Sequence, residues 1–480
     1  MDRPEKNQLE APCKMMIIKD TMHLFMQRAS IDRPVFFGLL TRVFNLITGP
    51  ITGILMISVF TAKLQGYYYT FQSLVALQTF AELGLSIVIL QFAAHEWSSL
   101  SLDNDGNIIG DNVALSRLAS LTRFVLKWYG IAAIFVLIGL GVGGYLFFSR
   151  SPDPSIDWEM PWFSLCFITS IAVLLLPITS ILEGCNQVSN LYTYSFYQAL
   201  FVKITLWLTI LLHTNLWVLT FSNIASIICI ITLILRKYKV FSKTLIFSFK
   251  VKEKLHWSND IWPMQWKIGL SCLCGYFVHY FFIPILFKYH GAVVAGQMGM
   301  TWSVVGLIPS IPTAWIAPKI PQFGMLIARR EYEELDRLFW RLMKITIVVS
   351  CFISFSGWLI VYILNVLQHP FAARLLPPLP MGIFAFAQIF QAISVPMAGY
   401  LRAHKQEPLL LISVLAAILI TCSNVFLGRY FSAMGMAVGY MISLLIVIPL
   451  VAWQWYRLKG IWHGDGKTIV GLDGKVSRYY

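Results

Sequence analysis

Long apolar segments of similar length recur along the whole chain, and they leave few folds open to it. Each is close to the roughly 20 apolar residues that an α-helix needs to cross the hydrocarbon core of a bilayer. Of the 480 residues, 57% are hydrophobic and only 12% are charged, whereas a soluble domain is about 25% charged. The sequence therefore predicts an integral membrane protein made of helices.

We predict about twelve transmembrane helices. Their expected ranges are 35–60, 67–92, 125–148, 161–182, 192–212, 216–235, 265–287, 292–317, 342–366, 379–401, 408–428 and 433–455. Twelve helices divide into six plus six, so we expect an all-α fold of two six-helix bundles related by a pseudo-two-fold axis along the membrane normal. The expected parts are a tail (1–34), an N-terminal bundle (35–235), a basic linker (236–264), a C-terminal bundle (265–455) and a second tail (456–480).

Basic residues predict the orientation, because Lys and Arg near membrane ends stay cytoplasmic. A cytoplasmic N-terminus puts most of the 37 Lys and Arg residues on that side, so we expect both termini to be cytoplasmic. The net charge of +14 indicates attraction to anionic membrane lipids, and no nucleic-acid motif accompanies it. The basic linker suits either a segment lying on anionic lipid or a solvated connection.

Two charged residues lie within the first two predicted helices, Arg42 in the first and Glu82 in the second. A charge at the centre of a membrane helix costs roughly 2.5 to 3.5 kcal/mol, so it normally faces a partner or a watery cavity. Arg42 shares a helix face with Asn45. Two interpretations stay open: the charges form an ion pair that holds the helices together, or Arg42 and Asn45 bind substrate in a cavity while Glu82 couples transport to an ion.

Other polar positions are candidates for substrate binding. Lys203 lies deep in the fifth predicted helix, Lys267 and His279 share a face of the seventh, and Gln297 and Trp302 lie in the eighth. Prolines interrupt the eighth helix, and irregular backbone at membrane depth is tolerated where it lines a cavity or is buried in protein. His279 also fits a plain helix contact, and Lys267 also fits a side chain that reaches the membrane surface.

The two halves carry a faint internal repeat. An offset of 225 positions aligns Arg42 with Lys267, Gly66 with Gly291 and Gln72 with Gln297. A second echo, at a different offset, is the pattern Leu-x-Arg-Leu at Leu115 and at Leu335. Both favour a duplicated six-helix unit.

Nothing in the sequence indicates an enzyme, a cofactor or a metal centre. The run Asp103–Asn107 resembles the start of a calcium loop, but Ala114 stands where a bidentate Glu is needed, so we expect a hydrated turn. Cys272 and Cys274 form a lone C-x-C inside a predicted helix, a pattern more typical of packing than of metal binding. We therefore name no catalytic residue, no metal ligand and no cofactor.

Three short motifs resemble bacterial oligosaccharide flippases of the polysaccharide transporter family. They are Gly66-Tyr67-Tyr68-Tyr69-Thr70-Phe71 continuing to Phe80-Ala81-Glu82-Leu83-Gly84-Leu85, then Ala295-Gly296-Gln297-Met298-Gly299-Met300, and Trp315-Ile316-Ala317-Pro318-Lys319-Ile320-Pro321. The family belongs to a superfamily of multidrug, oligosaccharidyl-lipid and polysaccharide exporters, which includes drug extruders and the flippase of the lipid-linked peptidoglycan precursor.

The resemblance implies a flippase that carries a polyprenyl-diphosphate-linked oligosaccharide, such as an O-antigen or capsular repeat unit, across the bacterial inner membrane by alternating access. A glycan polymerase and glycosyltransferases of the same pathway are then the expected partners. A cation-coupled drug extruder of the same superfamily is the alternative, although more carboxylates within the membrane are expected for it. A membrane polymerase fits less well, because it needs a large outer loop and the predicted outer loops are short.

Overall fold

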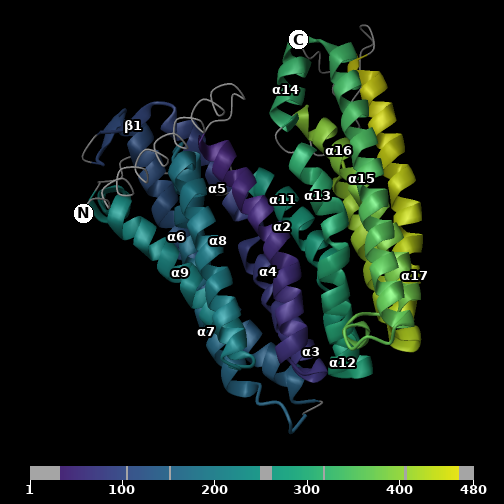
Figure 1. The fold of residues 1–480 in the computed structure, drawn as a ribbon. Helices are drawn as coiled ribbons and strands as arrows, with labels where there is room; N and C mark the ends of the chain where they lie inside the picture. Colours follow the sequence, from purple (N-terminus) through teal and green to yellow (C-terminus); the bar gives the residue numbers. More distant parts are fainter. Residues whose placement is uncertain are drawn as a thin grey trace, which may run out of the picture.

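The structure is a computed structural model that describes residues 33–103, 106–150, 153–248, 262–316, 319–404 and 408–463. Most of the two predicted tails and the second half of the predicted linker lie outside these residues. Nearly every described element is a helix, and the helices form two groups that meet at one end and lie apart at the other (Figure 1). The predicted all-α membrane fold is confirmed.

The N-terminal group holds most of its helices against α7 and α8. Its elements are α2 (Arg33–Val59), α3 (Ala62–Val75), α4 (Gln78–Glu82), α5 (Leu85–Trp97), β1 (Leu100–Leu102), β2 (Ile108–Gly110), α6 (Asn112–Phe148), α7 (Glu159–Gly184), α8 (Val188–Leu211), α9 (Trp217–Lys237), α10 (Lys239–Lys243) and the π-helix η1 (Thr244–Ser248). Helix α7 packs against α5, α6 and α9, while α8 packs against α2 and α9. This order gives a closed bundle, which we call the N-terminal bundle.

The second group, the C-terminal bundle, is built around α16 and α17. Its elements are α11 (Trp262–His279), α12 (Phe282–Val305), α13 (Leu307–Ile316), α14 (Ile320–Arg329), α15 (Tyr332–Val366), the 3-10 helix η4 (Ala372–Arg374), α16 (Pro378–Ala403) and α17 (Leu410–His463). Helix α16 packs against α13, α15 and α17, and α17 also packs against α11 and α12. Two hydrophobic cores support this bundle, and one of them is continuous with the core of the N-terminal bundle.

Within the described residues, nine helices are long and apolar enough to cross a membrane, or ten if α3 to α5 count as one bent span. Two of the nine are far too long for one crossing, because 49 and 54 residues extend about 75 to 80 Å against a hydrocarbon core of about 30 Å. Each contains a non-helical residue, Gly291 with φ 84° and Ser432 with φ 54°. Dividing both helices at these residues raises the number of candidate membrane spans from ten to twelve, and about twelve were expected from the sequence.

The internal repeat has a structural counterpart in the third long helix of each bundle. Leu115 and Arg117 lie near the start of α6, which is 37 residues long. Leu335 and Arg337 lie near the start of α15, which is 35 residues long. The two Leu-x-Arg-Leu segments therefore occupy matching places at the ends of α6 and α15.

Candidate functional site

The two bundles touch most closely where α3 crosses α12. A methyl group built on Gly66 would lie 1.9 Å from the carbonyl oxygen of Ala292, and one on Gly296 would lie 2.8 Å from the nitrogen of Gly66. Nearby, Phe287 of α12 packs its ring 5.0 Å from that of Tyr67. Glycine is needed here because only its backbone allows the helices to approach so closely. We call this end of the molecule the closed end.

Hydrogen bonds join the bundles around the same crossing. Gln65 donates from Nε2 to the carbonyl oxygens of Gly296, at 2.9 Å, and Arg374, at 3.1 Å. Arg374 donates from Nη2 to the carbonyl oxygen of Phe60 at 2.6 Å. We call Gln65, Arg374 and their acceptors the latch, since they tie α2 and α3 to η4 and α12. The sequence analysis singled out neither Gln65 nor Arg374 as a candidate.

The latch leaves two polar atoms without a partner in the described residues. Gln65 Oε1 and Arg374 Nη1 are both buried and make no hydrogen bond. A buried polar atom left unpaired costs about 1 to 3 kcal/mol. The closed end is therefore held by hydrogen bonds between the bundles, while two of its buried polar atoms have no partner in the described residues.

Arg42 lies on the side of α2 that faces the C-terminal bundle. Gly53 marks that side, because a methyl group built on it would lie 3.6 Å from Sδ of Met300 in α12. Arg42 is eleven residues earlier, which at 100° per residue returns it to within about 20° of Gly53. Arg42 and Asn45 are both exposed. Away from the closed end the ribbons of the two bundles lie apart (Figure 1).

Lys203 lies on a different side of α2 from Arg42. One turn further along α8, Trp207 donates from Nε1 to Oγ1 of Thr52 at 2.9 Å. Two turns earlier, the ring of Phe196 contacts that of Phe44 at 5.9 Å. Lys203 shares this stripe of α8 and is half-buried. The structure therefore places Lys203 at the contact between α8 and α2.

Glu82 is not paired with Arg42. It accepts a hydrogen bond from Ser86, whose hydroxyl lies 3.0 Å from the hydroxyl of Tyr129 in α6. No ion pair joins Arg42 and Glu82 among the described residues, so the contact considered from the sequence is absent. The reason is geometric: Arg42 faces the C-terminal bundle, whereas the carboxylate of Glu82 bonds within its own.

A sharp break in the second membrane segment follows Glu82 directly. Leu83 and Gly84 both have left-handed backbone, with φ 48° and 64°, and the segment bends by 45° there. The break packs against α11: a methyl group on Gly269 would lie 2.9 Å from the carbonyl oxygen of Leu83. Glu82 therefore lies beside an irregular contact between the bundles, a feature that the prediction of one continuous helix over 67–92 did not contain.

The two candidates on α11 lie apart. Lys267 is exposed, and its ammonium group lies 5.8 Å from the ring centroid of Trp266. His279 is half-buried at the C-terminal end of the same helix. Neither forms a hydrogen bond, ion pair or ring contact with Arg42 in the described part of the chain, and their proposed roles stay predictions.

Gln297 and Trp302 both make contacts within the C-terminal bundle. Gln297 donates from Nε2 to the carbonyl oxygen of Ala373 at 3.0 Å, which holds η4 against α12. Trp302 lies in a cluster of aromatic rings, 4.7 Å from that of Phe282 and 5.6 Å from that of Tyr440. Both side chains are half-buried, and their roles in substrate binding stay predictions.

Three further polar side chains inside the C-terminal bundle escaped the sequence analysis. Gln388, Asn424 and Tyr440 are at most 2% exposed, and each has a buried side-chain atom without a hydrogen-bond partner in the described residues. Unpaired polar groups are rare in folded proteins, and an ordered water or ion commonly satisfies them. No motif in the sequence distinguished these residues from ordinary polar positions in a helix.

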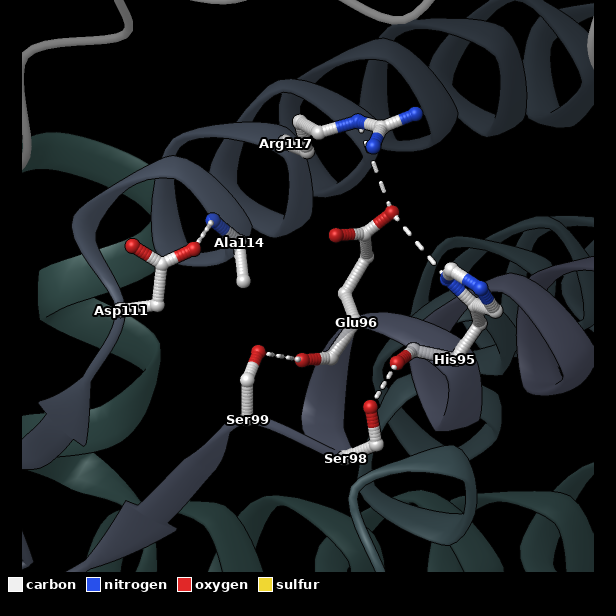
Figure 2. Close-up of polar contacts among 7 residues, drawn as sticks. All are labelled: His95, Glu96, Ser98, Ser99, Asp111, Ala114 and Arg117. Atoms are coloured by element: carbon white, nitrogen blue, oxygen red, sulfur yellow. Dashed lines mark hydrogen bonds and ion pairs between the residues drawn. The ribbon is translucent and has the colours of Figure 1, made fainter.

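A buried carboxylate, Glu96, fixes the far end of the N-terminal bundle (Figure 2). Its side chain is only 6% exposed and lies 3.5 Å from Nε of Arg117 and 3.6 Å from Nδ1 of His95. Asp111 accepts hydrogen bonds from the backbone of Val113 and Ala114 and so begins α6. The predicted turn at 103–107 falls between β1 and β2, and the structure describes residues 103, 106 and 107 of it; Asn107 donates its backbone N–H to Asp103.

A recess of about 600 Å³ beside this hairpin is lined by Ala94, Trp97, Ser98, Leu100, Ser101, Glu183, Gly184 and Asn186. None of the candidate residues lines it. The described residues also contain no group of three or more His, Cys, Asp or Glu side chains that could hold a metal ion. The candidate site is therefore the face of α2 that carries the exposed residues Arg42 and Asn45.

The architecture is that of a multi-pass helical membrane protein, and several solved structures share its fold. An inward-facing multidrug resistance transporter of the MATE family, in the MOP superfamily, matches with a TM-score of 0.60 and 11% identity, over 89% of this chain and all of the other. The lipid II flippase MurJ in an inward closed conformation matches with a TM-score of 0.61 and 12% identity, over 88% and 87% of the two chains.

A mutant of the Vibrio cholerae MATE transporter VcmN matches with a TM-score of 0.55 and 14% identity, over 93% of this chain and 99% of the other. No protein-family model matches the sequence, and no curated protein sequence does. The chain thus shares the fold of these MATE and MurJ structures.

Proposed function

We propose that this chain is a flippase that moves a polyprenyl-diphosphate-linked oligosaccharide across the bacterial inner membrane by alternating access. One observation carries the proposal: the guanidinium of Arg42 is exposed on the face of α2 toward the other bundle, with no carboxylate paired to it in the described residues. An unpaired guanidinium suits a phosphate group, which it can bind through two parallel hydrogen bonds.

The positions of the latch and of the basic residues support the alternating-access part of the proposal. The latch closes one end, and the described termini lie at the other (Figure 1). The distribution of Lys and Arg predicts that both termini are cytoplasmic. In that orientation the face of α2 that carries Arg42 and Asn45 is accessible from the cytoplasm. The structure then corresponds to the state that loads substrate from the inner leaflet. Asn45, beside Arg42, supplies an amide for sugar hydroxyls.

A cation-coupled extruder of drugs is the second candidate. It is favoured by Glu82, a carboxylate beside a broken helix at the contact between the bundles. In that case a cation bound at Glu82 drives the movement, and the substrate is a neutral or cationic compound. None of the solved structures named above is a polymerase, so we do not carry that alternative further.

Substrate retention tests the proposal. We expect native mass spectrometry of the purified wild-type protein to retain a polyprenyl-diphosphate oligosaccharide but not the matching polyprenyl monophosphate. Arg42→Ala should lose at least tenfold in retention. Arg341→Ala is the control, because Arg341 is also exposed but lies on α15. Equal retention by Arg42→Ala and the wild type would overturn the proposal, and retention of drugs with dependence on Glu82 would favour the second candidate.

A further inference from the structure

Two imidazoles face each other where α15 begins and where α16 and α17 end. This is the opposite end of the C-terminal bundle from the latch (Figure 1). His404 directly follows α16, and His463 is the last residue of α17. Their Nε2 atoms are 3.4 Å apart. We propose that His404 and His463 form a proton-sensitive clasp, which holds the ends of α16 and α17 together while at least one ring is neutral and releases them when both rings are protonated.

The hydrogen bonds assign the protons of the closed clasp. Nδ1 of His404 lies 3.1 Å from the carbonyl oxygen of Tyr400. A carbonyl can only accept, so this nitrogen carries the proton and Nε2 of the neutral ring is an acceptor. His463 then donates from Nε2 to Nε2 of His404. One further proton can be shared between the two Nε2 atoms, because His463 can then carry its own proton on Nδ1, toward the hydroxyl of Tyr400. When both rings are protonated, two N–H groups lie against each other at this distance, and the hydrogen bond is lost.

Stacking holds both rings in place and makes the clasp bridge three helices. The ring of His463 lies 3.9 Å from that of Tyr332 of α15, and the ring of His404 lies 4.1 Å from that of Trp462 of α17. Tyr400, which is fully buried, lies within 3.3 Å of Nδ1 of His463. The imidazoles are therefore part of the packing between the helix ends and are not free surface side chains.

The charged groups around the pair do not compensate a second positive charge. Asp336 of α15 is 2.5 Å from Nζ of Lys459 of α17, and its other oxygen accepts a hydrogen bond from Tyr400 at 3.3 Å. The carboxylate is thus already neutralised. Helix α14 also packs against α15 and α16, but it contributes no ion pair or hydrogen bond to the cluster within the described residues. Two protonated imidazoles would have to share the carboxylate of Asp336 with Lys459.

The direction of the pH dependence follows from burial. Burial lowers the pKa of His404 below its ordinary value, so the closed clasp favours the neutral ring. A histidine whose pKa is lowered in the closed state stabilises that state at pH values above the ordinary histidine pKa of about 6.5. This stabilisation is lost as the pH falls below about 6.5. Acidification from pH 7.5 to 5.5 should therefore open the clasp.

Hydrogen exchange at the two helix ends tests the clasp without any transport substrate, so its outcome is independent of the proposed function. After correction for intrinsic exchange rates, we expect protection of residues 396–404 and 455–463 to fall at least threefold between pH 7.5 and 5.5. Protection in the middle of α16 should not change. Equal protection of the helix ends at both pH values would overturn the proposal.

A matched set of variants identifies the group that titrates. His463→Gln keeps an N–H that can donate to His404 but cannot take up a proton, so we expect protection at pH 7.5 to be retained and its loss at pH 5.5 to disappear. His369→Gln is the control, since His369 is an exposed histidine after α15. Full pH dependence in His463→Gln, or loss of protection at pH 7.5 on adding a chelator, would show that a shared proton does not hold the pair.

Discussion

Arg42 and Glu82 have different surroundings although both are charged residues of membrane helices. The guanidinium of Arg42 is exposed toward the other bundle, while the carboxylate of Glu82 is bonded to Ser86 within its own. Each therefore has its own reason to be tolerated at membrane depth. Their contributions to stability should be separate.

A double-mutant cycle measures that separation. We expect the losses in the free energy of unfolding for Arg42→Gln and Glu82→Gln to add within about 0.5 kcal/mol, as they do for residues with no shared partner. The measurement is reversible unfolding in detergent of the two single variants and the double variant. A coupling of more than about 1 kcal/mol would show that the two residues form an ion pair in solution.

The sequence identified residues that need a partner but not the partner itself. Polarity within an apolar helix shows that Gln297 cannot face lipid, yet whether it meets substrate or a backbone carbonyl depends on how two distant segments pack. Arg374 shows the converse. Its local sequence carries no motif, and the approach of Phe60 from the other bundle gives it a structural role.

At the scale of helices, the crossing of α3 and α12 makes a sharp prediction. Gly66→Ala places a methyl group against the carbonyl of Ala292, and overpacking of this kind costs about 1 to 3 kcal/mol. We expect a lower midpoint of thermal unfolding and weaker closure. Gly139→Ala in α6, where a methyl group meets nothing within 4 Å, is the control and should be neutral. Equal effects of the two changes would show that the crossing is not a tight contact.

The helices themselves were largely predictable, and their interruptions were not. Length and hydropathy identify the membrane segments because crossing a bilayer fixes both. The break after Glu82 was missed because Leu83 is an unfavourable residue for left-handed backbone, so local preference argues against it. Packing of Leu83 against Gly269 of α11 overrides that preference, and such a long-range contact leaves no mark in the local sequence.

At the scale of the whole molecule, the latch should determine which side of the membrane has access to the interior. Hydrogen bonds to charged groups contribute about 1.5 to 3 kcal/mol. Loss of the Arg374 bond to Phe60 should therefore raise the population open at the latch end roughly ten- to a hundredfold. The variant is Arg374→Ala, and the reporter is Ala295→Cys, since Ala295 is fully buried in α12.

Labelling of intact cells with a membrane-impermeant maleimide, in a variant without the native cysteines, reads out this shift. Ala295→Cys should react slowly alone and at least tenfold faster when combined with Arg374→Ala. His369→Cys, exposed at the latch end, is the positive control and should label in both backgrounds. If His369→Cys is not labelled from outside, the predicted orientation is wrong; if it is labelled and Ala295→Cys shows no change, the latch does not control opening.

The glycine crossing of α3 and α12 has a mechanical consequence, because it lies at one end of both bundles. The bundles therefore extend much further from the crossing on one side than on the other. Helices α6 and α15, of 37 and 35 residues, extend about 50 Å, so a rotation of about 10° around the crossing would carry their far ends by roughly 9 Å over that length. A small shift at the crossing thus becomes a large displacement at the far ends of the helices. Changes in packing are therefore tolerated least at the crossing, where the displacement itself is smallest.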